Sequence, residues 1–102
     1  MGTRATIKFI DDYEEYYLYR GHDGFPDIVM NDLYKIIDKK KNSWSGSECG
    51  TLVSCFLGET YNLDNRLPDY ELTAGFHGEE SYIYEVIWSK DYKKWIVIMG
   101  RE

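Results

Sequence analysis

The chain of 102 residues has room for one domain with one core, and its hydrophobic fraction of 43% argues against a disordered protein. Its formal net charge of −6 argues against non-specific nucleic-acid binding, which depends on Lys and Arg to neutralise phosphates. The sequence contains no apolar stretch of about 18 residues and no leader pattern, so we expect a cytoplasmic protein that does not contact membranes.

The N-terminal third of the chain predicts a β-hairpin followed by a glycine-rich loop. Residues 4–11 alternate between apolar and polar side chains, and residues 15–20 form a second strand-like run after a polar turn. The loop at residues 21–25 carries two glycines, which permit tight backbone turns. Pro26 then suits the first turn of a helix, where its missing N–H costs nothing.

Two amphipathic helices are predicted in the middle of the chain, over residues 27–41 and from about residue 48 to residue 61. Their apolar residues recur at helical spacing: Ile28, Val29, Leu33, Ile36 and Ile37 in the first, and Cys49, Leu52, Val53, Phe56 and Leu57 in the second. The linker between them carries Trp44, either an interface anchor or a ring folded over the helix ends, and Ser45, which could form a capping box with Glu48.

The last third of the chain predicts three strands, at residues 70–74, 81–88 and 93–99, after a loop at residues 62–69. The whole chain therefore predicts a single α+β domain over residues 1–102, in the order ββααβββ. We expect an antiparallel sheet with both helices packed on one face.

The strand at residues 81–88 leaves two assignments of its faces open. If Ile83 and Ile87 point towards the helices, Tyr82 and Tyr84 line the opposite face and Glu85 is buried. In the reverse assignment the aromatic side chains are inside and Glu85 is outside. The position of Glu85 therefore decides whether the last strands present an open aromatic face.

Two glycine-flanked loops place a histidine beside acidic residues. His22 and Asp23 precede the first helix, and His77 and Glu79 lie between two predicted strands. If the loops meet, they could perform acid–base chemistry; as surface turns, they need no such role. The residues that we expect to bind a ligand are Arg20, His22, Asp23, Phe25, His77, Glu79, Tyr82 and Tyr84.

No known catalytic motif supports an enzyme, since the sequence lacks HExxH, CxxC, P-loop and G-x-S-x-G patterns. Cys49 and Cys55 lie six positions apart in one predicted helix, about 9 Å along its axis, which is too far for a disulfide. We therefore expect no catalytic residue, no metal and no cofactor.

Two blocks of sequence resemble a group of small phage and prophage proteins of uncharacterised function. The first is a Thr-Arg-Ala strand start at Thr3–Ala5 with the run Tyr19–Pro26, which is similar to a Tyr-x-His-Trp-Asp-Gly-Tyr-Pro motif of that group. The second is the run His77–Val86, which is similar to a His-Gly-Asp block followed by an aromatic Glu-Val strand. The chain departs from the first motif by having Gly21-His22 in place of His-Trp. The resemblance implies a mobile-element origin and a fold.

Together these features favour a non-enzymatic viral binding protein, plausible as a counter-defence factor in the host cytoplasm. In one version it occludes a basic surface of a host protein, and in a second it sequesters a small signalling nucleotide, with Arg20, His22 and the helix N-terminus holding phosphate. A small metal-dependent or acid–base hydrolase that uses His22, Asp23, His77 and Glu79 is the alternative. A homodimer through the tyrosine-rich face is compatible with either.

Overall fold

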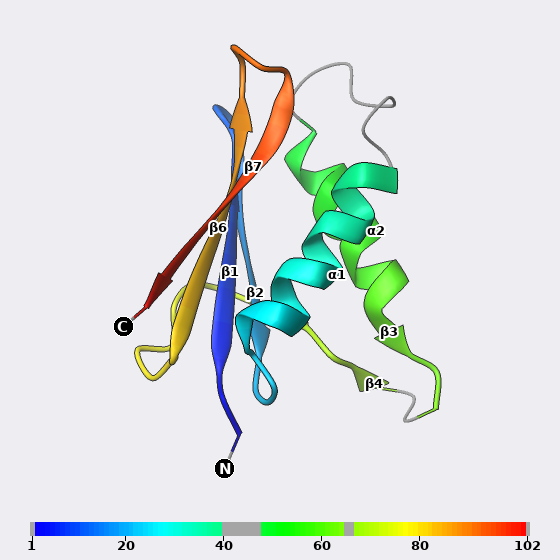
Figure 1. Ribbon diagram of the computed structural model, residues 1–102, viewed down its shortest axis with the longest axis vertical. Helices are drawn as coiled ribbons and strands as arrows, with labels where there is room; N and C mark the ends of the chain where they lie inside the picture. Colours follow the sequence, from blue (N-terminus) through cyan, green and yellow to red (C-terminus); the bar gives the residue numbers. More distant parts are fainter. Residues whose placement is uncertain (1, 40–47, 65–66, 102) are drawn as a thin grey trace.

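The computed structural model describes residues 2–39, 48–64 and 67–101, which form a twisted sheet with two helices against one face (Figure 1). The elements are β1 (Ala5–Ile10), β2 (Glu15–Arg20), α1 (Pro26–Lys39), α2 (Cys49–Thr60), β3 (Tyr61–Asn62), β4 (Leu67–Pro68), β5 (Glu71–Thr73), β6 (Tyr82–Ser89) and β7 (Lys94–Arg101). The predicted order ββααβββ is confirmed, and β3 and β4 are a short added pair that begins at Tyr61, the expected end of the second helix, and otherwise lies within the expected loop. Trp44 and Ser45 lie outside the described residues.

The main sheet has five strands in the order β5-β2-β1-β6-β7. The expectation of a wholly antiparallel sheet was wrong at one pair, because β1 and β6 run parallel, with Ala5 opposite Tyr82. The physical reason is that the chain enters β6 beside the start of β1, where the N–H of Ser81 donates a hydrogen bond to the carbonyl oxygen of Arg4 at 2.9 Å. Both strands therefore leave the same end of the sheet.

The core lies between the sheet and the helices, and the predicted helix stripes supply it. Both helices bury their central apolar residues: Val29, Leu33, Ile36 and Ile37 in α1, and Cys49, Leu52, Val53 and Phe56 in α2. The sheet contributes Ala5, Ile7, Phe9, Leu18, Tyr84, Val86 and Trp95. Because side chains alternate along a strand, the intervening residues form a second face that no helix covers.

Neither described helix is long and apolar enough to cross a membrane. In the described part of the chain, both cysteines are free thiols, as their spacing predicts.

Candidate functional site

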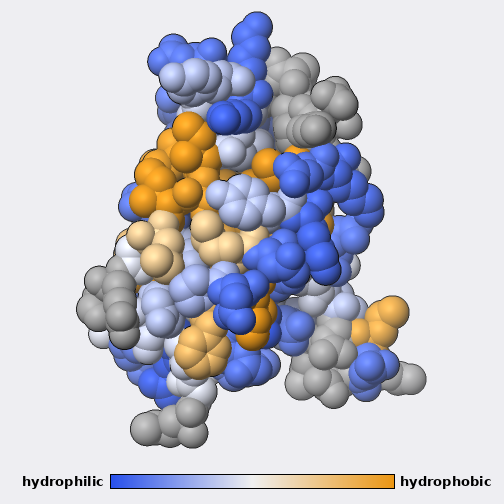
Figure 2. Space-filling view, viewed as in Figure 1, coloured by the Kyte–Doolittle hydropathy of each residue, from blue (hydrophilic) through white to orange (hydrophobic). Residues whose placement is uncertain are grey.

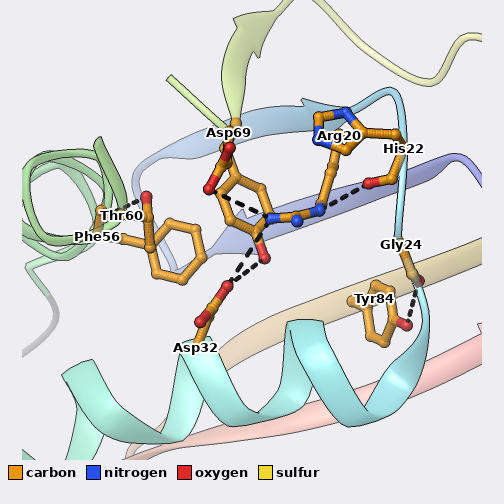
Figure 3. A network of polar contacts seen from close by, with 9 residues as sticks. Arg20, His22, Gly24, Asp32, Phe56, Thr60, Asp69 and Tyr84 are labelled. Carbon is orange, nitrogen blue, oxygen red and sulfur yellow. Dashed lines mark hydrogen bonds and ion pairs between the residues drawn. The ribbon is translucent and has the colours of Figure 1, made fainter. Parts of the chain in front are cut away.

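Arg20 lies inside the protein at the end of β2, with its side chain 8% exposed (Figure 3). Its Nε donates a hydrogen bond to the carbonyl oxygen of His22 at 2.7 Å. Its Nη1 lies 3.9 Å from Oδ2 of Asp32 and 4.0 Å from Oδ2 of Asp69. The guanidinium also lies over the ring of Tyr70, 4.9 Å from its centroid. The sequence suggested that the positive charge of Arg20 binds an anionic ligand, but in the structure this charge is balanced by the carboxylates of Asp32 and Asp69.

Tyr70 completes this network, and burial is the main reason that its pKa is raised, with Asp32 adding to the effect. Its hydroxyl donates to Oδ2 of Asp32 at 2.9 Å, so one carboxylate binds both Tyr70 and Arg20. Sequence reasoning missed Asp32, Asp69 and Tyr70 as partners of Arg20. Their positions on α1 and ahead of β5 give no local signal of that contact.

A polar cleft of about 510 Å³ lies beside the network, between α1 and the end of α2. Its lining residues are Asp32, Lys35, Ile36, Lys39, Glu59, Thr60 and Asp69. Nζ of Lys39 lies 2.7 Å from Glu59, which links the two helices across the cleft. The cleft therefore carries mixed charges, of which Lys39 and Glu59 pair with each other while Asp32 and Asp69 face Arg20.

His22 and Asp23 are exposed, but the next two residues of their loop, Gly24 and Phe25, make backbone hydrogen bonds to other parts of the fold. Asp23 adopts a left-handed backbone conformation (φ 52°), and the N–H of Gly24 donates to the carbonyl oxygen of Thr3 at 2.8 Å. The carbonyl oxygen of Phe25 accepts from two N–H groups in the first turn of α1 at 3.0 Å each. Two of the backbone donors at this helix N-terminus are therefore already in use.

Tyr82 and Tyr84 point towards the helices. Tyr84 is fully buried, and its hydroxyl donates to the carbonyl oxygen of Gly24 at 2.9 Å. Burial is the largest cause of the raised pKa of this phenol. Tyr82 is half-buried, with its ring centroid 6.4 Å from that of Tyr84 and 6.5 Å from that of Phe25. The two tyrosines therefore cover the end of the core that lies next to Gly24 and Phe25.

The turn between β5 and β6 is built around Glu80, a buried carboxylate that sequence reasoning did not single out. It accepts hydrogen bonds from the N–H groups of His77 (2.7 Å) and Gly78 (2.8 Å) and from the hydroxyl of Thr6 on β1. Burial acts to raise the pKa of Glu80, but these hydrogen bonds together outweigh it and hold the pKa below its usual value. Gly78 supplies the positive φ of 88° that the turn requires.

His77 and Glu79 project from this turn onto the uncovered face of the sheet. The imidazole of His77 stacks on Tyr19, and its Nε2 lies 3.0 Å from Oγ1 of Thr73. Glu79 accepts from the hydroxyl of Tyr19 at 3.2 Å and pairs with Arg4, also at 3.2 Å. These contacts bring His77 and Glu79 together on one surface.

The two histidine loops both lie at the end of the sheet from which the N-terminus emerges (Figure 1). His22 follows β2 on the side of α1, whereas His77 stacks on the uncovered face. Within residues 2–39, 48–64 and 67–101, no group of three or more His, Cys, Asp or Glu side chains could hold a metal ion.

Glu85 lies half-buried on the face away from the helices, so β6 follows the second of the two assignments. It is directly opposite Lys8 on β1 and Ile98 on β7. Ile83 and Ile87 share its face, while Tyr84 and Val86 are in the core. The aromatic side chains of β6 are therefore inside, and the uncovered face is made of other residues.

We call this uncovered surface the outer face and define it by the side chains that share it. Five are isoleucines, on three adjacent strands: Ile10, Ile83, Ile87, Ile96 and Ile98. On β2 they are continued by Tyr17, whose ring meets Phe76 edge-on at 5.1 Å, and by Tyr19. Figure 2 shows strongly hydrophobic surface over β6 and β7, on the side away from the helices. The sequence already indicated this surface, because apolar residues occur at both odd and even positions in residues 82–88 and 95–99 and therefore on both faces of each strand.

Comparisons of the chain with protein-family models, with curated proteins and with solved structures found no match.

Proposed function

We propose that this protein is a non-enzymatic binding protein that covers a surface of another protein with its outer face. One observation carries the proposal: β6 and β7 are apolar on both faces, but the helices cover only one. Strands of this kind are normally buried on both sides, and contiguous exposed apolar surface marks interaction sites. Ile98 is the clearest case, because this apolar side chain lies opposite Glu85 on the outer face and is 48% exposed.

The composition of the outer face supports a protein as the partner. Isoleucines occupy one half and the rings of Tyr17, Tyr19 and Phe76 the other, and aromatic side chains are enriched in protein interfaces. Lys8 and Glu85 lie opposite one another between the halves and can fix the orientation of a partner. The net charge of −6 favours rapid association with a basic surface.

The resemblance to phage proteins extends this proposal to a host factor in the host cytoplasm, with counter-defence as the purpose. The nucleotide-sequestering version has less support, because Arg20 already faces Asp32 and Asp69. We expect no thermal shift with mono-, di- or cyclic nucleotides alone. A shift of several degrees would support the nucleotide version instead.

The test is quantitative affinity purification from host lysate with Ile83→Lys and a matched control. Ile83 lies on the outer face between Thr6 and Gly100. Leu72 is 66% exposed and lies on the edge strand β5, paired with Leu18 of the helix-facing side. We expect Ile83→Lys to reduce recovery of the partner at least tenfold, about 1.4 kcal/mol, and Leu72→Lys to leave it unchanged. Equal recovery with both variants would contradict the proposal.

A further inference from the structure

The strand β7 ends the five-stranded sheet, and its outer edge carries no neighbouring strand among the described residues. It is eight residues long, longer than most edge strands. Natural proteins blunt such edges with charged residues or proline, because an exposed row of backbone N–H and C=O groups pairs with other chains. The stretch Trp95–Met99 contains neither charge nor proline.

We propose that β7 pairs antiparallel with β7 of a second copy of this chain, with Val97 on the two-fold axis. Two identical edges that pair antiparallel are related by an axis perpendicular to the sheet. Such an axis keeps each face on its own side, so a helix-side residue must meet another helix-side residue. Residues on the same face of β7 differ in number by two or a multiple of two. The residue numbers of any two positions that face one another across the axis must therefore add up to an even number.

Among the even registers, the one centred on Val97 gives the most complete apolar match. It places Ile96 opposite Ile98 on the outer face and Trp95 opposite Met99 on the helix side. Lys94 then faces Gly100, and the one pair of like charges, Lys93 opposite Arg101, lies at the two ends of the paired strands, outside the apolar stretch. Centring on Ile96 would place Lys94 opposite Ile98, and centring on Ile98 would place Ile96 opposite Gly100.

A groove beside β7 fits the same register. It has a volume of about 350 Å³ between α1 and β7, and its lining includes Tyr34, Ile37 and Trp95. In the register centred on Val97, Met99 of the second copy is opposite Trp95, at this groove. Met99 is 45% exposed in the single chain, and methionine adapts well to irregular apolar gaps. The two-fold axis repeats this contact, so each copy supplies one side chain and one groove.

The acidic side chains of the chain lie outside the β7 edge. Two copies with a net charge of −6 repel one another over most of their surfaces. Residues 93–101 contain three cationic side chains and no acidic one. Two copies that meet along β7 therefore keep their acidic surfaces apart. The result is a continuous sheet of ten strands, twice the five of one copy, with both outer faces on the same side.

The first test is the mass of the unmodified protein in solution. Sedimentation equilibrium at about 100 μM should give about 24 kDa, twice the 12.1 kDa of one chain. A mass of 12.1 kDa at that concentration would overturn the proposal. Pairing of the β7 edge with another protein only, and not with a second copy, would overturn it as well.

The second test fixes the register with two charge variants. In one, Ile96 and Ile98 are both replaced by lysine, and in the other both are replaced by glutamate. Each variant alone should be monomeric, since positions 96 and 98 of the two copies face one another with like charges. An equimolar mixture should restore the 24 kDa species, about twice 12.1 kDa, as a heterodimer. A dimer that persists in either variant, or a mixture that stays monomeric, would contradict this interface.

This inference does not depend on the proposed function. Ile83→Lys lies away from the β7 edge, so it should leave the dimer intact while it weakens binding of the partner.

Discussion

The imidazole ring of His77 lies parallel to the phenol ring of Tyr19, with the ring centroids 3.7 Å apart and 5° between the planes. This stack joins the turn between β5 and β6 to the end of β2. The hydrogen bond between Tyr19 and Glu79 holds the next part of the same turn. A loop that the sequence presents as polar and glycine-rich is therefore well anchored on the outer face.

We expect the stack to be visible in the proton NMR spectrum. The ring current of Tyr19 should move the imidazole resonances of His77 upfield of those of His22, which is exposed. In Tyr19→Leu the two histidines should give similar shifts, because the facing ring is absent. Equal shifts in the unmodified protein would show that the stack does not persist in solution.

Removal of the charge of Glu80 should destabilise the protein in a pH-dependent manner. Because the pKa of Glu80 is lowered in the folded state, its contribution is present above the unfolded value of about 4.5 and is lost as the pH falls through the folded pKa. Glu80→Gln should lower the free energy of unfolding by about 1–3 kcal/mol at pH 7. The N–H groups of His77 and Gly78 each bond a different carboxylate oxygen, and the amide keeps only one acceptor oxygen, so one of these N–H groups loses its acceptor.

Urea denaturation at pH 7 and at pH 3 measures both effects. The difference between Glu80→Gln and the unmodified protein should shrink at the lower pH. Glu79→Gln is the matched control, because Glu79 is exposed and its pair with Arg4 is worth about 0–1 kcal/mol. A difference that is constant with pH would contradict the role given to the Glu80 carboxylate.

The helices and most strands could be predicted because their signals are local. The stripe Val29, Leu33, Ile36 and Ile37 repeats at helical spacing, and that pattern decides which side is buried wherever the helix packs. The parallel pairing of β1 with β6 could not be predicted. It depends on how the chain crosses from β5, at one edge of the sheet, to β6 beside β1, and the sequence of neither strand indicates the direction of its neighbour.

The candidate site was predictable only in part, for related reasons. Alternation could not choose the buried face of β6, since Tyr84 and Val86 on one side and Ile83 and Ile87 on the other are all apolar. The position of Glu85 on the face away from the helices decided it and moved the candidate surface from tyrosines to isoleucines. Arg20 suggested an anion site because its partners are distant in sequence, and only the fold brings Asp32 and Asp69 to it.

Gly24 should tolerate no side chain. A Cβ at this position would lie 2.7 Å from the Cβ of Ala5, the first residue of β1, and 3.0 Å from the carbonyl oxygen of Thr3, just before that strand. Gly24→Ala should therefore cost about 1–3 kcal/mol of stability through overpacking. Gly58→Ala is the control, because a Cβ there meets nothing within 4 Å in helix α2 and should stabilise by about 0.5–1 kcal/mol. The urea midpoints of the two variants, compared at an unchanged m-value, measure both changes in stability. A Gly24→Ala variant as stable as the unmodified protein would contradict the close approach.

The two thiols should differ sharply in reactivity. Burial, with further contributions from Asp11 and Glu14, raises the pKa of Cys49 from 9.0 to about 12. At pH 8 it then has about a thousandfold less thiolate than an ordinary thiol, and the thiolate is the reactive form. Cys55 is only half-buried. A disulfide reagent should therefore modify Cys55 first and Cys49 only as the protein unfolds. Cys55→Ser should remove the fast phase and Cys49→Ser should keep it, whereas two equally fast thiols in the unmodified protein would show that Cys49 is accessible.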